Sequence, residues 1–372
     1  MKIEIRRETF LESFAIVGSV APSRSTKPVL ENIRIEATPA FTILLATNNE
    51  VGMRLEAVDV KVIQPGVALL PVSRVLPLLR ETKDETLTIE LNGDRIVIRG
   101  HQTKVTLQAR DPDEFPPVAS FDEEAYLTIR AGVLKRMLRR TVFATDNESS
   151  RFALGGVLLE FGSGELVAVA TDGRRLAKMS GAAEKVGEPT TETMTIVPTA
   201  AISLLEKSLP DDDSPVHLAP RSNDILVRCG RTVLYSRLVE GRFPRWRDVF
   251  PGEGADAVRI TLPVDALISA IRQSVVVADQ ESRGVDFAFD AGTVSLDLAC
   301  ANIGESKVDL PIAYEGEKLS ITLDYRFFLD FLRALDSSST FTMEVEGAER
   351  AALCTTDDGY AYVIMPLARD RR

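Results

Sequence analysis

The chain has 372 residues, of which 45% are hydrophobic and 27% are charged, and its formal net charge is −11. This length is too great for one ordinary hydrophobic core and predicts two or three domains. The negative charge excludes a protein that coats itself in nucleic acid by bulk attraction, so any contact with DNA requires a local basic surface.

A short strand followed by an amphipathic helix occurs three times, and each copy is followed by a second unit of the same kind. The first units cover residues 3–20, 127–145 and 260–279, and the second units cover residues 69–82, 195–210 and 320–335. The second helices are expected to begin at Pro71, Pro198 and Asp324, which are spaced by 127 and 126 residues. Such even spacing of one unit indicates an internal repeat.

Alternating apolar and polar residues, which are typical of strands, fill much of the remaining sequence of each repeat. Asn92-Gly93 and Asp358-Gly359 predict tight turns between strands. The pattern therefore predicts an α+β fold with three repeated domains, each with two helices packed on antiparallel sheets. The expected domains are residues 1–120, 125–251 and 257–372, with linkers at Pro116–Glu124 and Pro251–Ala257.

The helix expected at Ala131–Thr145 has one apolar face and one basic face. Residues at helical spacing form the apolar face: Leu134, Met137, Leu138, Thr141 and Val142. The opposite side is expected to carry Lys135, Arg136, Arg139 and Arg140, with no carboxylate in the helix to offset their charge. This predicts a surface that meets a polyanion; the alternative is a solvated face with chance clustering. The other helices mix basic residues such as Arg74 and Arg80 with acidic ones, so both interpretations stay open there.

Motifs for catalysis or metal binding are missing from the sequence. His101 and His217 lie in strand-like segments without ligands at metal-binding spacing, and no phosphate-binding or nucleophile motif occurs. Asp172 is expected in a turn that ends a strand, and Asp211–Asp213 in a solvated loop. Three scattered cysteines and the lack of a long apolar run predict a reduced, cytoplasmic protein that does not enter a membrane. We expect a non-enzymatic protein with no cofactor and no metal.

Several segments together carry a resemblance to a known family. They are VATDGRRLA (169–177), RFALGGVLLE (151–160), LVEGRFPRWRDVFP (238–251), YVIMPL (362–367), PVLENI (28–33) and DPDEFP (111–116). With these segments in the family's order along the chain, and over its whole length, the sequence resembles the bacterial DNA polymerase III beta subunits, the beta sliding clamps that act as DNA processivity factors.

The resemblance implies a DNA clamp fold in which a head-to-tail homodimer closes into a ring of six domains around duplex DNA. Such a ring tethers the replicative polymerase for processive DNA replication and contacts DNA without sequence preference. The implied partners are the polymerase alpha subunit, the clamp loader, and repair and translesion polymerases.

The resemblance also assigns residues to three sites. The partner-peptide pocket comprises Leu154, Thr171, Gly173, Arg174, Arg175, Leu176, Pro244, Val249, Val363, Met365, Pro366 and Leu367. DNA contacts are implied for Arg24 and for the loop at Asn147-Glu148, which adds Arg24 to a DNA-binding set of Arg74, Arg80, Lys135, Arg136, Arg139 and Arg140. The dimer interface should join Val105 and Leu107 to Val276 and Val277.

Four features depart from the family pattern. Arg174 stands where many relatives have histidine, and Asp248 stands where a basic residue is common. Glu148 places a negative charge in a loop expected to approach DNA, and a tail, Ala368–Arg372, extends past the pocket. The alternative to a clamp is a protein-interaction scaffold that never encircles DNA, and a third hypothesis is an enzyme of unknown type.

Overall fold

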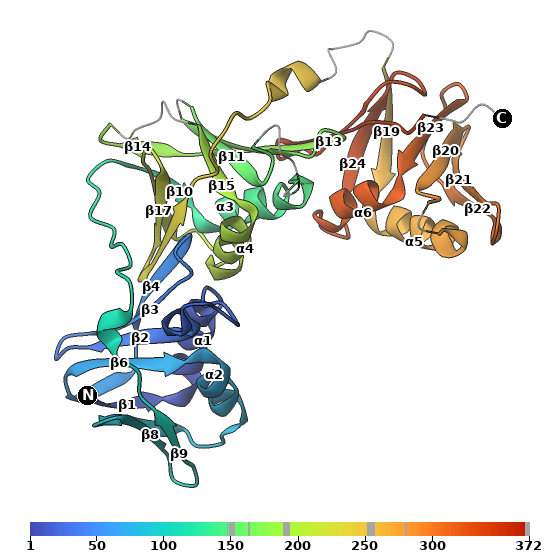
Figure 1. Cartoon of the computed structure of the whole chain (residues 1–372). Helices are drawn as coiled ribbons and strands as arrows, with labels where there is room; N and C mark the ends of the chain where they lie inside the picture. The colour runs from blue at the N-terminus through green and yellow to red at the C-terminus, as the bar shows by residue number, and fades with distance from the viewer. Residues whose placement is uncertain are drawn as a thin grey trace. The chain divides into compact units, whose positions relative to one another are not determined.

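The computed structural model describes residues 1–146, 148, 153–162, 164–188, 194–250, 257–279 and 281–368. The chain divides into two compact units: Met1–Lys135 with Ala183–Leu238, and Arg136–Ala182 with Val239–Arg372. Each unit combines helices with antiparallel sheets (Figure 1), so the predicted α+β class is confirmed. Among the described residues, no helix is both long enough and apolar enough to cross a membrane.

The predicted strand–helix units are present in all three repeats. The α-helices of the described residues are α1 (Arg7–Gly18), α2 (Val72–Glu81), α3 (Ala131–Arg139), α4 (Thr199–Ser208), α5 (Val264–Ser274) and α6 (Tyr325–Arg333). Each begins directly after a strand: β1 (Lys2–Arg6), β6 (Gly66–Pro71), β10 (Tyr126–Arg130), β15 (Thr195–Pro198), β19 (Val258–Pro263) and β23 (Leu319–Asp324). The N-caps of α2, α4 and α6 are Pro71, Pro198 and Asp324, the three positions predicted from the sequence.

Short 3-10 helices mark several of the connections between these elements. They are η1 (Pro28–Glu31), η2 (Pro112–Glu114), η3 (Val142–Ala144), η4 (Trp246–Val249) and η5 (Val275–Val277). The helix expected at Ala131–Thr145 is therefore shorter than predicted, because α3 ends at Arg139 and η3 follows it.

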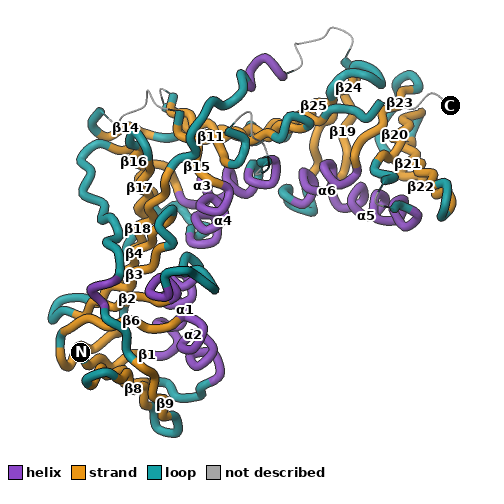
Figure 2. The backbone as a smooth tube through the Cα atoms, in the orientation of Figure 1, coloured by secondary structure: helices purple, strands orange, loops and turns teal. Residues whose placement is uncertain are grey.

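A nine-stranded sheet forms the centre of the first unit, in the order β14-β10-β16-β17-β18-β4-β3-β2-β6. The strands not yet introduced are β2 (Asn32–Ala37), β3 (Thr42–Thr47), β4 (Val51–Ala57), β14 (Glu184–Val186), β16 (Pro215–Pro220), β17 (Asp224–Cys229) and β18 (Thr232–Arg237). Every residue of β3 is buried, because α1 covers one face and a cluster containing Val29, Leu69 and Phe115 covers the other. Figure 2 shows α1 beside α2, with which it is in contact.

The second sheet of this unit has five strands, in the order β5-β1-β7-β8-β9. Its further strands are β5 (Val60–Gln64), β7 (Thr86–Asn92), β8 (Arg95–Arg99) and β9 (Lys104–Gln108). Burial alternates along β1, where Ile3 and Ile5 face the core, as a strand with one solvated face requires. The predicted hairpin joins β7 to β8, but the turn is Gly93-Asp94 rather than Asn92-Gly93, and only Gly93 has a positive φ.

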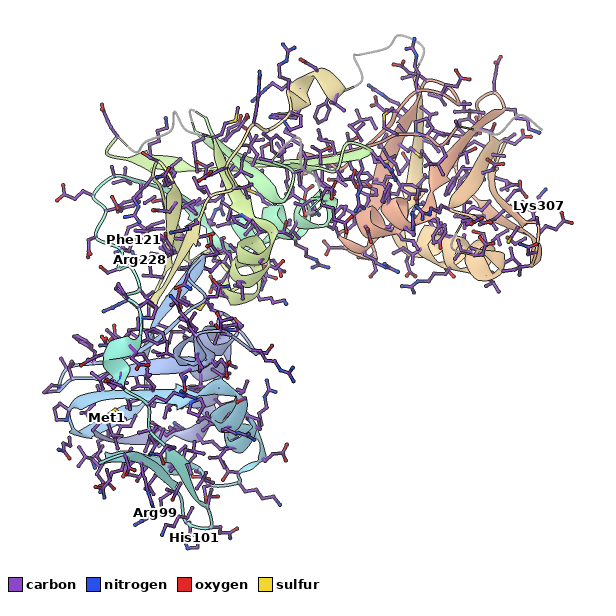
Figure 3. The ribbon with its side chains drawn as sticks, in the orientation of Figure 1. Met1, Arg99, His101, Phe121, Arg228 and Lys307 are labelled. Atoms are coloured by element: carbon purple, nitrogen blue, oxygen red, sulfur yellow. The ribbon has the colours of Figure 1, made fainter. Side chains whose placement is uncertain are left out.

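The first-to-second linker is held against the nine-stranded sheet. Phe121 packs with Ala219, Leu226 and Val233, and the guanidinium of Arg228 lies 4.5 Å from the Phe121 ring centroid (Figure 3). A linker anchored by an aromatic side chain in this way is an ordered part of the fold.

The second unit contains two sheets, one of them in the order β22-β21-β20-β23. In the other sheet the strands of this unit run in the order β11-β12-β13-β26-β25-β24-β19. The strands not yet introduced are β11 (Gly156–Phe161), β12 (Glu165–Thr171), β13 (Arg175–Ala182), β20 (Gly284–Asp290), β21 (Thr293–Cys300), β22 (Gly304–Pro311), β24 (Thr340–Val345), β25 (Ala352–Thr355) and β26 (Tyr360–Ile364). Helix α5 packs on β21 and β22, and α6 packs on β23 and β26.

Two strand pairings join different repeats into one sheet. In the first unit β18 pairs with β4, and in the second unit β13 pairs with β26. Both pairings are antiparallel and extend over five residue pairs. The middle repeat is therefore divided between the two compact units.

Candidate functional site

A tight turn between β12 and β13 forms the centre of the predicted peptide site. Thr171 Oγ1 donates to the Arg175 carbonyl at 2.6 Å and accepts from Gly173 N at 3.1 Å. Asp172 Oδ1 accepts from Arg174 N at 2.9 Å and from Arg175 N at 3.0 Å. Gly173 has φ +85°, which a residue with a side chain adopts only with strain. Asp172 is thus a turn-forming carboxylate, as predicted.

The last strand of the chain lies directly beside this turn. Leu176 is paired with Val363 across the β13–β26 ladder, and Met365 N donates to the Arg174 carbonyl at 2.9 Å. Leu367 N then donates to the Thr322 carbonyl at 2.9 Å. Residues separated by almost two hundred positions in sequence are thereby held at one place.

Another predicted pocket residue, Leu154, lies beside a third segment of the chain. Ala153 N donates to the Arg242 carbonyl at 3.3 Å, which places Leu154 beside the segment that carries Pro244 and Val249. Farther along this segment, Arg247 pairs with Glu160 at 2.7 Å. Asp248, which stands where a basic residue is common in the family, forms an ion pair with Arg245 at 3.3 Å. The neighbouring arginine thus partly compensates its negative charge.

The predicted pocket residues differ widely in exposure. Met365 (46% exposed), Val249, Gly173 and Arg174 are exposed, and Pro244, Pro366 and Leu367 are half-buried. Five others are buried: Leu154, Thr171, Arg175, Leu176 and Val363. Burial of the three aliphatic members, Leu154, Leu176 and Val363, indicates that they pack in the core. The exposed and half-buried residues are those with surface available to a ligand in this conformation.

The basic face of α3 is smaller than the sequence predicted. Arg136 and Arg139 are exposed, and Lys135 Nζ donates to the Leu209 carbonyl at 2.9 Å. Arg140 is only 5% exposed, so its placement on the solvated face is wrong. Its Nη1 lies 2.6 Å from Asp358 Oδ2, and Arg136 Nη1 lies 3.7 Å from the same oxygen.

Arg140 is enclosed by the third repeat. Its guanidinium lies 5.2 Å from the Tyr360 ring centroid, and Tyr360 Oη donates to the Arg140 carbonyl at 2.8 Å. Burial raises the pKa of Asp358, but hydrogen bonds from Thr356 and Arg140 and the charges of both arginines outweigh it and lower that pKa below its usual value. The ion pair with Asp358 offsets the energetic cost of burying the charged side chain of Arg140.

The remaining predicted DNA contacts lie on solvated segments. Arg24, Arg74 and Arg80 are all exposed, and Glu148 is exposed with its N–H bonded to Asp146. Asn147 and the tail residues 369–372 lie outside the described residues.

Two free sheet edges carry the residues predicted to form a dimer interface. Among the strands of the described residues, β9 pairs only with β8, and it carries the half-buried Val105 and Leu107. β22 is the edge of the four-stranded sheet and contacts η5, in which Val276 is 77% exposed and Val277 is half-buried. Unpaired edges of this kind are available for pairing with another chain.

The hairpin before β9 is held by a carboxylate. Asp84 Oδ1 accepts from the backbone N–H groups of His101 and Gln102, both at 3.2 Å. A Cβ on Gly100 would lie 2.2 Å from Asp84 Oδ2, so a larger residue at this position would displace the Asp84 carboxylate. Figure 3 shows Arg99 and His101 at this end of the hairpin.

Three family models match the chain consecutively. They describe the N-terminal, central and C-terminal domains of the DNA polymerase III beta subunit, and they match residues 1–119, 128–245 and 247–368. Together they cover almost the entire chain, in the order of the family. The chain belongs to the DNA polymerase III beta subunit family.

Relatives and solved structures agree with this assignment over the full length. The beta sliding clamp of Chlamydia muridarum is 29% identical over 369 residues, covering 99% of both chains. The beta sliding clamp of Escherichia coli K12 is 26% identical, with 99% of this chain and 100% of that protein covered. A Pseudomonas aeruginosa sliding clamp bound to griselimycin is 25% identical, with a TM-score of 0.90 and coverage of 99% and 100%.

Membership in this family confirms several predictions made from the sequence. The three repeated domains are those of the beta subunit, and the function is that of a sliding clamp in DNA replication. Proteins of this family are non-catalytic processivity factors, so the chain is not an enzyme.

The structure also identifies an exposed apolar residue that the sequence analysis missed. Ile303 is 57% exposed in the turn before β22. A single apolar residue in a polar turn forms no pattern from which its exposure could be predicted.

Proposed function

We propose that two copies of the chain join head to tail into a closed ring of six domains around duplex DNA. Each copy contributes domains at residues 1–120, 125–251 and 257–372. A ring holds DNA topologically, so it needs only weak, sequence-independent phosphate contacts and remains free to slide. The consecutive match of three beta-subunit domain models is the observation that carries this proposal.

The two free edges support the proposed dimer interface. Val105 and Leu107 on β9 would meet Val276 and Val277 beside β22 of the second copy, and the exposed Ile303, in the turn before β22, would add to the apolar contact. The exposed charges differ between the two edges: Arg99 at the end of β8 and Lys104 at the start of β9 are basic, whereas β22 carries Glu305 and Asp309, with Lys307 between them. Opposite charges favour pairing of unlike edges over pairing of like ones, which suits a head-to-tail arrangement.

Electron microscopy of the purified protein tests the ring directly. The expected particle contains two subunits with six similar lobes and an open centre, and sedimentation should give the mass of a dimer. Monomers at micromolar concentration, without rings, would contradict the proposal and favour a scaffold that never encircles DNA.

The proposed DNA surface comprises basic residues of α2, of α3 and of one loop, and all of them are exposed except the half-buried Lys135. Its members are Arg24, Arg74, Arg80, Lys135, Arg136 and Arg139; Arg140 is excluded because it is buried in an ion pair. A local surface of this kind reconciles DNA contact with a net charge of −11.

Replacing Arg136 and Arg139 with glutamine is expected to weaken DNA binding and its salt dependence. If each side chain contacts one phosphate, the slope of log K against log salt should fall by about 1 for each residue. Fluorescence anisotropy with a duplex, measured over a range of salt concentrations, gives this slope. Lys185→Gln, on the exposed strand β14, removes the same charge as a control and should leave the slope unchanged. An unaltered slope in the double variant would show that Arg136 and Arg139 of α3 do not contact DNA phosphates.

We also propose that partner proteins bind at the exposed residues around the β12–β13 turn. Met365 is a large exposed hydrophobic side chain beside the polar Gly173-Arg174 turn, and Val249 is a second exposed hydrophobic side chain among the residues proposed for this site. Side chains of this kind can bind a short peptide with apolar anchors. The partners proposed are the polymerase alpha subunit, the clamp loader, and repair and translesion polymerases, all in the cytoplasm. The griselimycin complex of the Pseudomonas aeruginosa clamp supports a ligand site in this family and supplies a probe.

A further inference from the structure

Arg175 is fully engaged within the protein. The residue is 8% exposed, and its Nε donates to Asp172 Oδ2 at 2.9 Å. Nη1 donates to Asp330 Oδ2 at 2.8 Å, and Nη2 donates to the Phe143 carbonyl at 2.7 Å. The guanidinium also lies 4.3 Å from the ring centroid of Phe327. Each guanidinium nitrogen has a hydrogen-bond partner within the protein, and the Phe327 ring covers one face of the group. This side chain is therefore poorly placed to contact a ligand.

These contacts connect α6 of the third repeat to the turn of the middle repeat. Asp330 lies on α6, whereas Asp172 lies in the turn and also accepts the backbone N–H groups of Arg174 and Arg175. The Arg174 carbonyl in turn accepts from Met365 N. A continuous series of hydrogen bonds therefore leads from Asp330 through Arg175 to the two exposed residues Arg174 and Met365.

We infer that Arg175 is a positioning residue and that Asp330, outside the ligand site, controls ligand affinity through it. This inference rests on the proposed partner site. Arginine suits the role because its rigid, planar group can bind two carboxylates and a carbonyl at once. When Asp330 is lost, the guanidinium keeps only one carboxylate, and the turn that carries Gly173 and Arg174 is held less firmly.

Griselimycin affinity of the full-length protein, measured by calorimetry at 10 °C, tests the inference. Asp330→Asn keeps the shape of the side chain but removes its charge, and it should weaken binding about tenfold. Arg175→Lys should weaken binding to a similar extent, and the double variant should be no weaker than the weaker single variant, because both changes break the same contact. Circular dichroism at the same temperature establishes that each variant is folded.

Two matched controls separate this effect from general changes of charge. Asp330 is also 3.7 Å from Arg333, so Arg333→Gln alters the same carboxylate without touching Arg175. Asp336→Asn, at an exposed position just after α6, removes the same charge as Asp330→Asn. Neither control should change griselimycin affinity.

Three results would overturn the inference. Wild-type affinity in folded Asp330→Asn, even with a lower melting temperature, would make the contact merely structural. Weak binding in Arg175→Lys alone would instead indicate direct contact between Arg175 and the ligand. A wild-type chain that does not bind griselimycin would overturn the proposed partner site, and this inference with it.

Discussion

Leu176→Lys is expected to destroy both the fold of the second unit and its binding of griselimycin. The leucine is 1% exposed and lies in the middle of three paired strands, opposite Thr171 and Val363. The substitution loses the burial of an aliphatic side chain and places an unpaired ammonium group in the core, which should cost about 4 kcal/mol or more. Urea denaturation measures this loss.

Met365→Lys is the matched comparison for this prediction. Met365 follows β26 and is 46% exposed, so the same new charge should leave the free energy of unfolding within about 0.5 kcal/mol of wild type. Griselimycin binding should nevertheless be lost, because an apolar contact of the proposed site becomes charged. If Leu176→Lys were as stable as wild type, its side chain would have to reach solvent, and the core assignment of Leu176 would be wrong.

Arg140→Met is expected to destabilise the second unit by about 2 kcal/mol. Breaking a fully buried ion pair costs about 3–5 kcal/mol, and the smaller figure applies because the Asp358 side chain is 36% exposed. Methionine retains much of the apolar stem, so the loss reports mainly the unpaired Asp358. Thermal or urea denaturation gives the free energy of unfolding of Arg140→Met and of the control Arg139→Met, which changes an exposed arginine. Only Arg140→Met should be clearly less stable than wild type.

The pH dependence of stability gives a second test of the same pair. The pKa of Asp358 is lowered in the folded state, so its contribution is present above the unfolded-state pKa and is lost as pH falls through the folded-state value. The difference in stability between wild type and Arg140→Met should therefore shrink on acidification. A constant difference between neutral and acidic pH would show that Asp358 is not the partner that matters.

Local sequence patterns predicted the repeated elements because their causes are local. A strand that ends at a proline or aspartate and leads directly into an amphipathic helix carries its signal within about fifteen residues. The starts of α2, α4 and α6 could therefore be placed at Pro71, Pro198 and Asp324, where the structure has their N-caps. The Asn92-Gly93 turn was misplaced by one residue, because glycine alone supplies the positive φ there.

The functions of individual arginines could not be predicted in the same way. Helical spacing put Arg140 with Arg136 and Arg139, yet its partner Asp358 is 218 residues away. Arg175 belongs to a family motif, but its pairing with Asp330 spans 155 residues. A one-dimensional pattern contains no information on such partners, and a buried arginine looks the same in sequence as a solvated one.

The shared sheets of the middle repeat bear on how this protein can be cut. In a fragment containing only residues 125–251, β18 would lose its partner β4, and β13 would lose its partner β26. Two newly unpaired strands, rich in buried side chains such as Leu234 and Leu176, would then face solvent. Such a fragment should aggregate on expression. Each compact unit is built from two separate segments of the chain, so a single cut inside the middle repeat breaks at least one shared sheet. The repeats of this protein are thus not independent folding units.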